Sequence, residues 1–318
     1  MTRVVFVTDP LARFNPKKDS TMAMILAAQK RGWQVAVLEL NDLSVIAGIA
    51  YGRVRSIQVD FAAEPWYCLG EAETLPLSAF SVILMRKDPP FDMEYIYATY
   101  ILELAEAAGT LVVNKPQSLR DANEKMFINH FPQSITDTLV TRDKTQIREF
   151  LAQHQDIILK PLDGMGGVSI FRVGRSDPNF NVIVETLTQS GSRYVMVQRY
   201  LPEVKQGDKR ILLIDGEPIP YGLARIPASG ETRANLAAGG TGLGQALSER
   251  EYWLCEQVKP VLRAKGLLFV GLDVIGGFIT EINVTSPTCI RELDSEFKLD
   301  IAGGLMDCIA AKLMDNRR

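Results

Sequence analysis

Residues 267–288 read LLFVGLDVIGGFITEINVTSPT, two runs of β-type residues separated by two glycines at 276–277. Such runs around a glycine pair predict an antiparallel hairpin. Asp273 lies in its first strand, and Glu281 and Asn283, two residues apart in the second, share one face. Two carboxylates and an amide oxygen form a hard-oxygen donor set that suits Mg²⁺. A solvent-facing polar strip has the same alternation, so the pattern alone leaves both interpretations open.

The register of this hairpin decides whether the three side chains can share a metal. A tight two-residue turn at the glycine pair would place Asp273 opposite Thr280, on the other face from Glu281. A three-residue loop, or a bulged turn, would pair Asp273 with Glu281 instead. A shared site therefore requires the longer or bulged arrangement.

The first third of the chain alternates strand-like and helix-like segments. The predicted strands are 4–7, 35–40, 81–85 and 111–114, and the predicted helices are 20–32, with Ser20 as its cap, and 92–108. This alternation predicts a parallel sheet covered by helices. Ligands of such sheets bind beyond the carboxyl ends of the strands. Arg86 directly follows the strand 81–85, which favours a ligand contact over a solvated loop charge.

The rest of the chain does not continue this regular alternation of strands and helices. Strands at 156–161, 169–173 and 194–200 predict a small α+β unit, and two hairpins follow, the first turning at Asp215-Gly216. A helix opens at Ser248 with a capping box to Glu251, and Ser118 with Asp121 resembles a second box, opening a helix that carries Lys125. We predict units at 1–122, 123–200 and 201–318, with a mobile functional loop at about 227–244.

Composition excludes several classes of function. The chain has 318 residues, with 35 Lys and Arg against 38 Asp and Glu, a net charge of −3 that argues against a nucleic-acid binder. Two histidines, His130 and His154, leave little for a multi-histidine metal site or a Ser-His-Asp hydrolase. Four scattered cysteines indicate reduced thiols, and no apolar run is long enough for a membrane helix. We expect a soluble cytoplasmic protein with no nucleic-acid or membrane partner.

Two further sets of residues point to anionic ligands. The segment ILKPLDGMGG (158–167) brings Lys160 to a loop containing Gly164, Gly166 and Gly167, whose backbone N–H groups could approach phosphate oxygens, although a plain glycine turn would look the same. The second set is made of arginines, which suit bidentate contact with carboxylate or phosphate. They are Arg210, Arg225 and Arg233, the last placed in the 227–244 loop like the cation of a lid.

Taken in chain order, Lys125, Lys160 with its glycine loop and the Asp273, Glu281 and Asn283 set resemble the ATP-grasp superfamily, in which two α+β units close on ATP behind a pre-ATP-grasp domain. Longer blocks resemble the bacterial glutathione synthetase family over nearly the whole chain. These blocks are MRKDPPFD (85–92), VNKPQSLRDANEK (113–125), ILKPLDGMGG (158–167), GDKR (207–210), GETRANLAAGG (230–240) and EINVTSPTCIRE (281–292).

The resemblance implies an ATP-dependent carboxylate–amine ligase that joins γ-glutamylcysteine to glycine through an acyl phosphate. It also implies a homo-oligomer, with a tetramer as the expected state. The ATP-binding residues that it implies are Lys125, Lys160, Gly164, Gly166, Gly167, Gln198, Tyr200, Leu201 and Asp208. Asp273, Glu281 and Asn283 would bind Mg²⁺, for which Mn²⁺ could substitute. Arg210, Arg225 and Arg233 would be catalytic, and Arg86, Arg225, Arg233 and Ser286 would grip substrate carboxylates.

Two alternatives remain open at this stage. One keeps the fold and changes the acceptor, as in D-alanine–D-alanine or glutamate-adding ligases, although the arginine positions and the RKDPP block argue against it. The other is a nucleotide-binding regulatory protein without turnover. The presence of both lysines, the metal-ligand set and the lid arginine argues against that reading.

Overall fold

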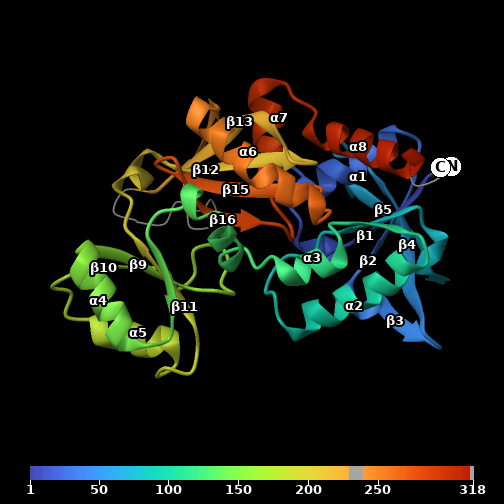
Figure 1. Ribbon diagram of the computed structural model, residues 1–318. Helices are drawn as coiled ribbons and strands as arrows, with labels where there is room; N and C mark the ends of the chain where they lie inside the picture. The colour runs from blue at the N-terminus through green and yellow to red at the C-terminus, as the bar shows by residue number, and fades with distance from the viewer. Residues whose placement is uncertain (229–238, 316–318) are drawn as a thin grey trace.

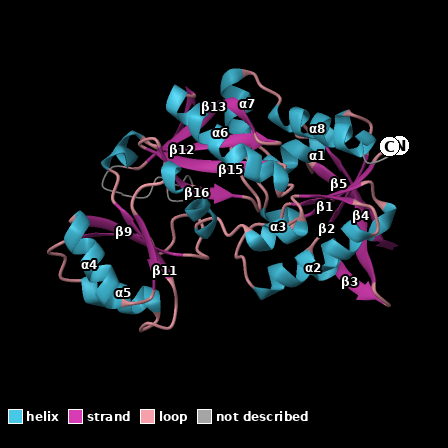
Figure 2. Ribbon diagram, in the orientation of Figure 1, coloured by secondary structure: helices cyan, strands magenta, loops and turns pink. Residues whose placement is uncertain are grey.

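A computed structural model describes residues 1–228 and 239–315. The chain forms three β-sheets, each with its own helices; in this view the central unit lies at the left, the N-terminal unit at the right and the C-terminal unit above them (Figures 1 and 2). Each sheet lies within one of the ranges predicted from the sequence, 1–122, 123–200 and 201–318. The boundaries between the units stay a prediction.

The N-terminal sheet has a parallel centre, as predicted. Strands β2, β1, β6 and β7 run parallel in that order, and β4 pairs antiparallel with β2 and carries β3 and β5. This antiparallel arm was not predicted. The elements are β1 (Arg3–Val7), α1 (Ser20–Lys30), β2 (Gln34–Leu38), β3 (Leu43–Ile46), β4 (Ile49–Val59), β5 (Tyr67–Pro76), β6 (Val82–Met85), α2 (Met93–Ala107), β7 (Leu111–Val113) and α3 (Pro116–Asp121).

Strand β1 is buried on both faces, which is typical of a strand inside a helix-covered parallel sheet. Val5 and Val7 pack on the side of α2, and Val4 and Phe6 pack on the side of α1. The run VVFV therefore does not alternate apolar with polar residues. Thr8 follows directly at the carboxyl end of the strand and is buried as well.

Two predicted helix caps differ in the structure. Asp19, not Ser20, caps α1, because its carboxylate accepts from the backbone N–H groups of the first turn. Helix α3 begins at Pro116, a residue suited to the first helical position, so Ser118 lies inside it and donates to the Lys265 carbonyl. Lys125 consequently follows α3 and precedes a short 3₁₀ helix at Met126–His130.

The central unit is a four-stranded antiparallel sheet in the order β10, β9, β11, β8, with helices over one face. Ile157 and Leu159 pack under these helices, so alternation turns Ile158 and Lys160 to the opposite face. That face looks toward the C-terminal unit (Figure 1). The elements are β8 (Thr138–Thr141), α4 (Lys144–His154), β9 (Asp156–Pro161), β10 (Phe171–Gly174), α5 (Phe180–Thr188) and β11 (Val195–Arg199).

The C-terminal unit is a five-stranded antiparallel sheet in the order β14, β13, β12, β15, β16. The predicted turn at Asp215-Gly216 is confirmed, with φ of 49° and 78°, and so is the capping box between Ser248 and Glu251. The elements are β12 (Asp208–Ile214), β13 (Glu217–Ile226), β14 (Thr241–Ala246), α6 (Glu249–Ala264), β15 (Phe269–Ile275), β16 (Phe278–Asn283), α7 (Ile290–Phe297) and α8 (Ile301–Asp315).

The predicted loop at 227–244 is shorter than expected, because its last residues belong to β14 and pair with β13. The glycines that indicated a loop have a packing role in this strand. A Cβ on Gly244 would collide with Phe297 and Glu296 of α7, and one on Gly242 would press on Leu223. A strand that approaches a helix this closely requires glycine.

Asn114 ties the N-terminal unit to the C-terminal sheet. Its buried amide donates to the carbonyls of Phe269 (2.8 Å) and Val284 (2.7 Å) and accepts from the backbone N–H of Phe269 (2.9 Å). The end of β7 is thereby fixed against the start of β15 and the end of β16.

Candidate active site

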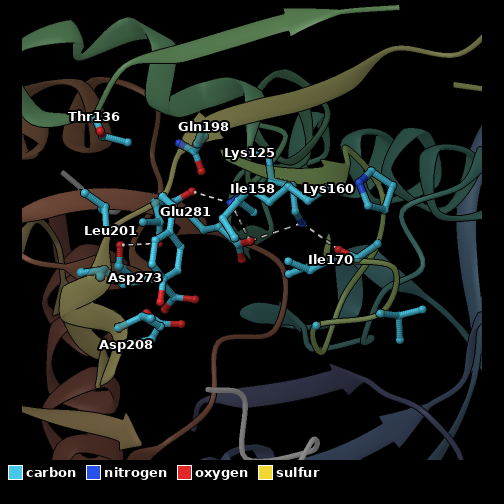
Figure 3. A pocket seen from close by; sticks show the side chains of 18 of the residues that line it. Lys125, Thr136, Ile158, Lys160, Ile170, Gln198, Leu201, Asp208, Asp273 and Glu281 are labelled. Carbon is cyan, nitrogen blue, oxygen red and sulfur yellow. Dashed lines mark hydrogen bonds and ion pairs between the residues drawn. The ribbon is translucent and has the colours of Figure 1, made fainter. Parts of the chain in front are cut away.

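A cavity lies between the central and C-terminal sheets, and Figure 3 shows the side chains that line it. All nine residues predicted to contact ATP line this one cavity, together with two of the three predicted metal ligands. They come from the segment after α3, which carries Lys125, and from β9, the glycine loop, β11 and its continuation, the start of β12, and the β15–β16 hairpin. The structure therefore brings together residues that are up to 156 positions apart (281 − 125).

Two buried lysines share one carboxylate at the base of this cavity (Figure 3). Nζ of Lys160 lies 3.3 Å from Oε1 of Glu281, and Nζ of Lys125 lies 3.5 Å from the same atom. Burial opposes the charged form of Glu281, but the two lysines outweigh it and hold the pKa of this carboxyl below its usual value. Burial likewise opposes the Lys125 ammonium, but Glu281 and Glu124 raise its pKa. Lys125 is thus held as a cation, and Lys160 lies beside it on the same carboxylate.

The glycine loop closes over the same lysines. Nζ of Lys125 donates to the Gly164 carbonyl at 2.7 Å, which anchors the loop above the cavity. Gly166 and Gly167 have φ of 62° and 82°, a left-handed backbone that other residues adopt at a cost. The glycines therefore permit the fold of a loop that lines the cavity.

The β15–β16 hairpin has the register that a shared metal site requires. Its turn is the tight glycine pair, flanked by Ile275 opposite Phe278, but a β-bulge follows and pairs Asp273 with Glu281. Thr280 is the extra residue of this bulge, and its hydroxyl donates to the Asp273 carbonyl. The pairing predicted for a bulged hairpin is thus present, although the bulge lies in the strand and the turn itself has two residues.

Asp273 is surrounded by arginines. Arg210 donates from Nε to Oδ1 at 2.5 Å and from Nη2 to Oδ2 at 3.1 Å, and Arg225 contacts Oδ2 at 2.9 Å. Burial would raise the pKa of Asp273, but these two guanidinium groups hold it far below its usual value. Asp208 also binds Arg225, at 2.6 Å, yet burial dominates there and raises its pKa to about 7. Its Oδ1 is buried without a partner.

Family models match both parts of the chain. Residues 124–298 match the ATP-grasp domain of prokaryotic glutathione synthetase, and residues 2–120 match its N-terminal domain. The chain belongs to the prokaryotic glutathione synthetase family. It is 61% identical to the glutathione synthetase of Pseudomonas aeruginosa, over 98% of both chains, and 57% identical to that of Escherichia coli strain K12, over 98% of this chain and 99% of the relative.

Solved structures share the fold of this glutathione synthetase family member. D-cycloserine synthetase DcsG aligns with a TM-score of 0.70 at 17% identity, over 98% of this chain and 99% of the other. The ATP-grasp ligase PsnB, complexed with minimal precursor, Mg and ADP, aligns with a TM-score of 0.62 at 17% identity, over 98% of both chains. The expected fold, an ATP-grasp ligase preceded by a pre-ATP-grasp domain, is confirmed. The chain is an ATP-dependent ligase.

Its donor set fits a hard divalent cation completed by other ligands. Asp273 and Glu281 both line the cavity in their charged form. Nδ2 of Asn283 is buried without a partner at the end of the same strand, although Asn283 does not line the cavity. Within residues 1–228 and 239–315, no cluster of three His, Cys, Asp or Glu could hold a metal unaided. Phosphate oxygens and water would have to complete the coordination, which is typical of Mg²⁺.

Sequence reasoning missed the apolar wall of the cavity. Ile158 precedes Lys160 by two positions on β9 and so shares its face, and Ile275 follows Asp273 by two on β15. This period-two spacing was readable in the sequence. The wall also includes Met165, Val168, Ile170 and Val204, with Thr136 as a polar neighbour.

The predicted substrate residues are divided between two places. Arg225 lies beside the cavity through its bonds to Asp208 and Asp273. Arg86 and Ser286 do not line the cavity, but they contact one another, because Ser286 Oγ donates to the Arg86 carbonyl at 3.3 Å. Arg233 lies outside the described residues.

Proposed function

We propose that this chain is a glutathione synthetase that joins γ-glutamylcysteine to glycine and converts ATP to ADP and phosphate. One observation carries the proposal: Lys125 and Lys160 converge on Glu281 beneath a glycine loop, in the cavity that also contains Asp273. Cations, backbone amides and hard-oxygen ligands gathered in one place suit the binding of a nucleotide triphosphate.

The chemistry needs positioned charge more than a side-chain nucleophile. The cysteinyl carboxylate of γ-glutamylcysteine attacks the γ-phosphorus of ATP, ADP leaves, and an acyl phosphate forms. The glycine amine then attacks the acyl carbon, and phosphate departs with the oxygen that the carboxylate supplied. In this scheme Lys125 and Lys160 hold the phosphates and Asp208 accepts from the ribose hydroxyls. The apolar wall, with Gln198, Tyr200 and Leu201, receives adenine.

Asp273, Glu281 and Asn283 would hold Mg²⁺, for which Mn²⁺ could substitute. The cation would supply charge neutralisation at the phosphates. The protein's own contribution is to keep the two carboxylates opposite one another and ionised.

The arginines are assigned to the developing negative charge. Arg210 is buried and oriented by its two-point contact with Asp273, so its guanidinium is preorganised beside the cavity. We assign it to the acyl phosphate and to the oxyanion that follows. Arg225 and Arg233 would grip the substrate carboxylates, and Arg86 and Ser286 would hold the distal end of γ-glutamylcysteine.

We also propose that the enzyme is cytoplasmic and forms a homo-oligomer, with a tetramer as the expected state. Within the described part of the chain, no helix is both long and apolar enough to cross a membrane. Helix α2 exposes a stripe that a second copy could cover, made of Met93, Tyr97, Tyr100 and Leu104. Light scattering of the purified protein at several concentrations gives the mass directly, and a monomer at all of them would contradict the oligomer.

An ADP-release assay tests the proposed activity. ADP should form rapidly only when ATP, a divalent cation, γ-glutamylcysteine and glycine are all present, and glutathione should appear in equal amount. Rapid ADP release with a different acceptor amine, and not with glycine, would instead indicate another carboxylate–amine ligase.

A further inference from the structure

A second polar cluster lies outside the nucleotide cavity, at the carboxyl ends of the parallel strands β1 and β6. It contains Asp9 after β1, Arg86 and Asp88 after β6, and Tyr95 on α2. In Figure 1, β16 points toward this N-terminal sheet, and the segment that follows it reaches the cluster through Ser286 and Pro287.

Arg86 is a buried guanidinium with neutral partners. Its side chain is 4% exposed, and it donates from Nε to Thr21 Oγ1 at 3.1 Å and from Nη2 to the Pro287 carbonyl at 3.0 Å. Among residues 1–228 and 239–315, no carboxylate lies within ion-pair distance of it. A buried cation with neutral partners is costly, so an anionic group supplied by a ligand would offset its desolvation.

Asp88 is the opposite case, a half-buried carboxylate without a cation. Burial raises the pKa of this carboxyl, and the Ser286 hydroxyl lies close to it. The neighbouring Lys87 does not neutralise it, because Nζ of Lys87 pairs with Asp9 at 3.0 Å and donates to the Asp88 carbonyl at 2.6 Å. Asp9 in turn accepts from the Asp88 backbone N–H at 2.9 Å. The Asp9–Lys87 pair therefore holds Asp88 in place, and no ion pair to Asp88 occurs in the described part of the chain.

Two buried hydroxyls give an independent indication of a ligand. Thr8 Oγ1 and the Tyr95 hydroxyl are both without a hydrogen-bond partner, and each residue is 1% exposed. The Tyr95 hydroxyl is close enough to Arg86, Asp88 and Asp9 to feel their charges. Buried hydroxyls are normally satisfied, so an orphan beside two unpaired opposite charges indicates that polar ligand atoms complete the cluster.

We propose that Arg86 and Asp88 together bind the amino-acid head group of the γ-glutamyl substrate, its α-carboxylate on Arg86 and its α-ammonium on Asp88. An α-amino acid carries a carboxylate and an ammonium group side by side. The cluster offers an oppositely charged side chain for each, Arg86 for the carboxylate and Asp88 for the ammonium, and these two side chains do not pair with each other. This inference rests on the proposed function and adds the residue that recognises the amine.

The path from this cluster to the nucleotide cavity suits a dipeptide substrate. Asn283 ends the strand that carries Glu281, and Ser286, which contacts the Arg86 carbonyl, follows it by three residues. Three extended residues span on the order of 10 Å, comparable to an extended γ-glutamyl dipeptide. One segment would then run alongside the substrate, with the reacting carboxylate near the phosphates and the amino-acid head at Asp88.

The test crosses two variants with two substrate analogues. Glutarylcysteine lacks only the α-ammonium group, and the α-carboxamide of γ-glutamylcysteine lacks only the α-carboxylate. The wild-type enzyme should prefer γ-glutamylcysteine over each analogue by about 10- to 100-fold in kcat/KM, the worth of a charged hydrogen bond. Asp88→Asn should reduce the preference over glutarylcysteine to within about threefold and keep the preference over the carboxamide. Arg86→Gln should do the reverse, and the KM for ATP should stay within about threefold of wild type in both.

Asp19→Asn is the matched control, because it removes a nearby negative charge and keeps a residue that can cap α1. It should retain both preferences. Full discrimination against glutarylcysteine by a folded Asp88→Asn enzyme would overturn the assignment. If that variant does not fold, the wild-type enzyme still decides, since equal use of glutarylcysteine and γ-glutamylcysteine would also overturn it. Failure of the wild type to ligate γ-glutamylcysteine at all would instead refute the proposed function.

Discussion

At the scale of single residues, the candidate site is organised by shared charges. Asp273 receives two arginines, and Glu281 receives two lysines. Each carboxylate is therefore both a candidate metal ligand and the group that holds the surrounding cations in place. Substitution of one charged residue leaves the charges of its partners partly unpaired inside the protein. A variant can therefore lose both activity and stability, and the two have to be measured separately.

Arg210→Ala should lower kcat by about 100-fold or more, because a buried donor aimed at developing charge is lost, while the KM for ATP changes by less than about fivefold. Steady-state kinetics with saturating γ-glutamylcysteine and glycine measure both. Arg148→Ala, on the exposed face of α4, is the control and should behave as wild type. A loss of ATP binding equal to the loss of kcat would contradict the assigned role.

Asp208 should make stability depend on pH. Its folded pKa is about 7, above the value near 4 of an unfolded aspartate, so the folded state binds more protons between these pH values. The contribution of Asp208 to stability therefore falls as pH rises from 5 to 8. Relative to wild type, Asp208→Asn should gain on the order of 2–3 kcal/mol in unfolding free energy over that range, measured by denaturant titration. If the difference in unfolding free energy between Asp208→Asn and wild type does not vary between pH 5 and 8, the carboxyl does not titrate in that range and the prediction is wrong.

The charged residues of the site could be predicted from the sequence, and their surroundings only in part. Residue type singled out Lys160 and its glycines, although a plain glycine turn would look the same, and the resemblance implied Gln198 and Asp208; all of them line the cavity. The cap of α1 was misplaced by one residue, because Asp19 and Ser20 are both good caps and local sequence does not decide between them. The ion pairs of Asp273 depend on contacts with β12 and β13, which no local pattern contains.

At the scale of elements, the β15–β16 hairpin shows what a turn motif does not determine. The glycine pair predicts the turn, and the turn is present, but the bulge at Thr280 decides which residue opposes Asp273. The bulged strand also makes a hydrogen bond outside the hairpin, since the backbone N–H of Ile282 donates to the Glu124 carbonyl at 2.9 Å. The register is thus set partly by a segment more than 150 residues earlier in the chain.

The glycine loop should be sensitive to a single methyl group. Gly167 has a φ of 82°, so Gly167→Ala costs about 1 kcal/mol in this conformation and displaces the loop above the lysines. We expect the KM for ATP to rise about five- to tenfold. Gly174→Ala, at the end of the neighbouring strand β10, is the control, because its Cβ would enter open space at an ordinary φ. Equal KM values for ATP in both variants would show that the loop does not contact the nucleotide.

At the scale of the whole molecule, the three sheets have to keep fixed positions relative to one another if the cavity and the Arg86–Asp88 cluster are to bind one substrate. The parallel core of the N-terminal sheet followed from strand–helix alternation. The antiparallel arm β3–β5 did not, because β3 and β5 are mostly solvent-exposed and the buried alternation of β4 is interrupted at Ser56. The hydrogen bonds of Asn114 to the segments of β15 and β16 could not be predicted from the sequence either, because Asn114 lies in a segment that resembles a linker.

Asn114→Ala should destabilise the protein by about 3–5 kcal/mol, because three buried hydrogen bonds are lost and backbone groups of Phe269 and Val284 are left without partners. Thermal and denaturant unfolding measure the loss. Asn179→Ala, at an exposed helix end where the side chain makes no capping bond, should change the unfolding free energy by less than about 0.5 kcal/mol. A small effect at Asn114 would mean that the units are held together elsewhere.

The most direct test of the account follows an oxygen atom. Both oxygens of the cysteinyl carboxylate of γ-glutamylcysteine are labelled with ¹⁸O, and the phosphate released with ATP and glycine is analysed by mass spectrometry. Attack of the carboxylate on the γ-phosphorus predicts one ¹⁸O atom in each phosphate and one retained in glutathione. Unlabelled phosphate, with ADP still formed, would contradict activation of the substrate as an acyl phosphate in this cavity.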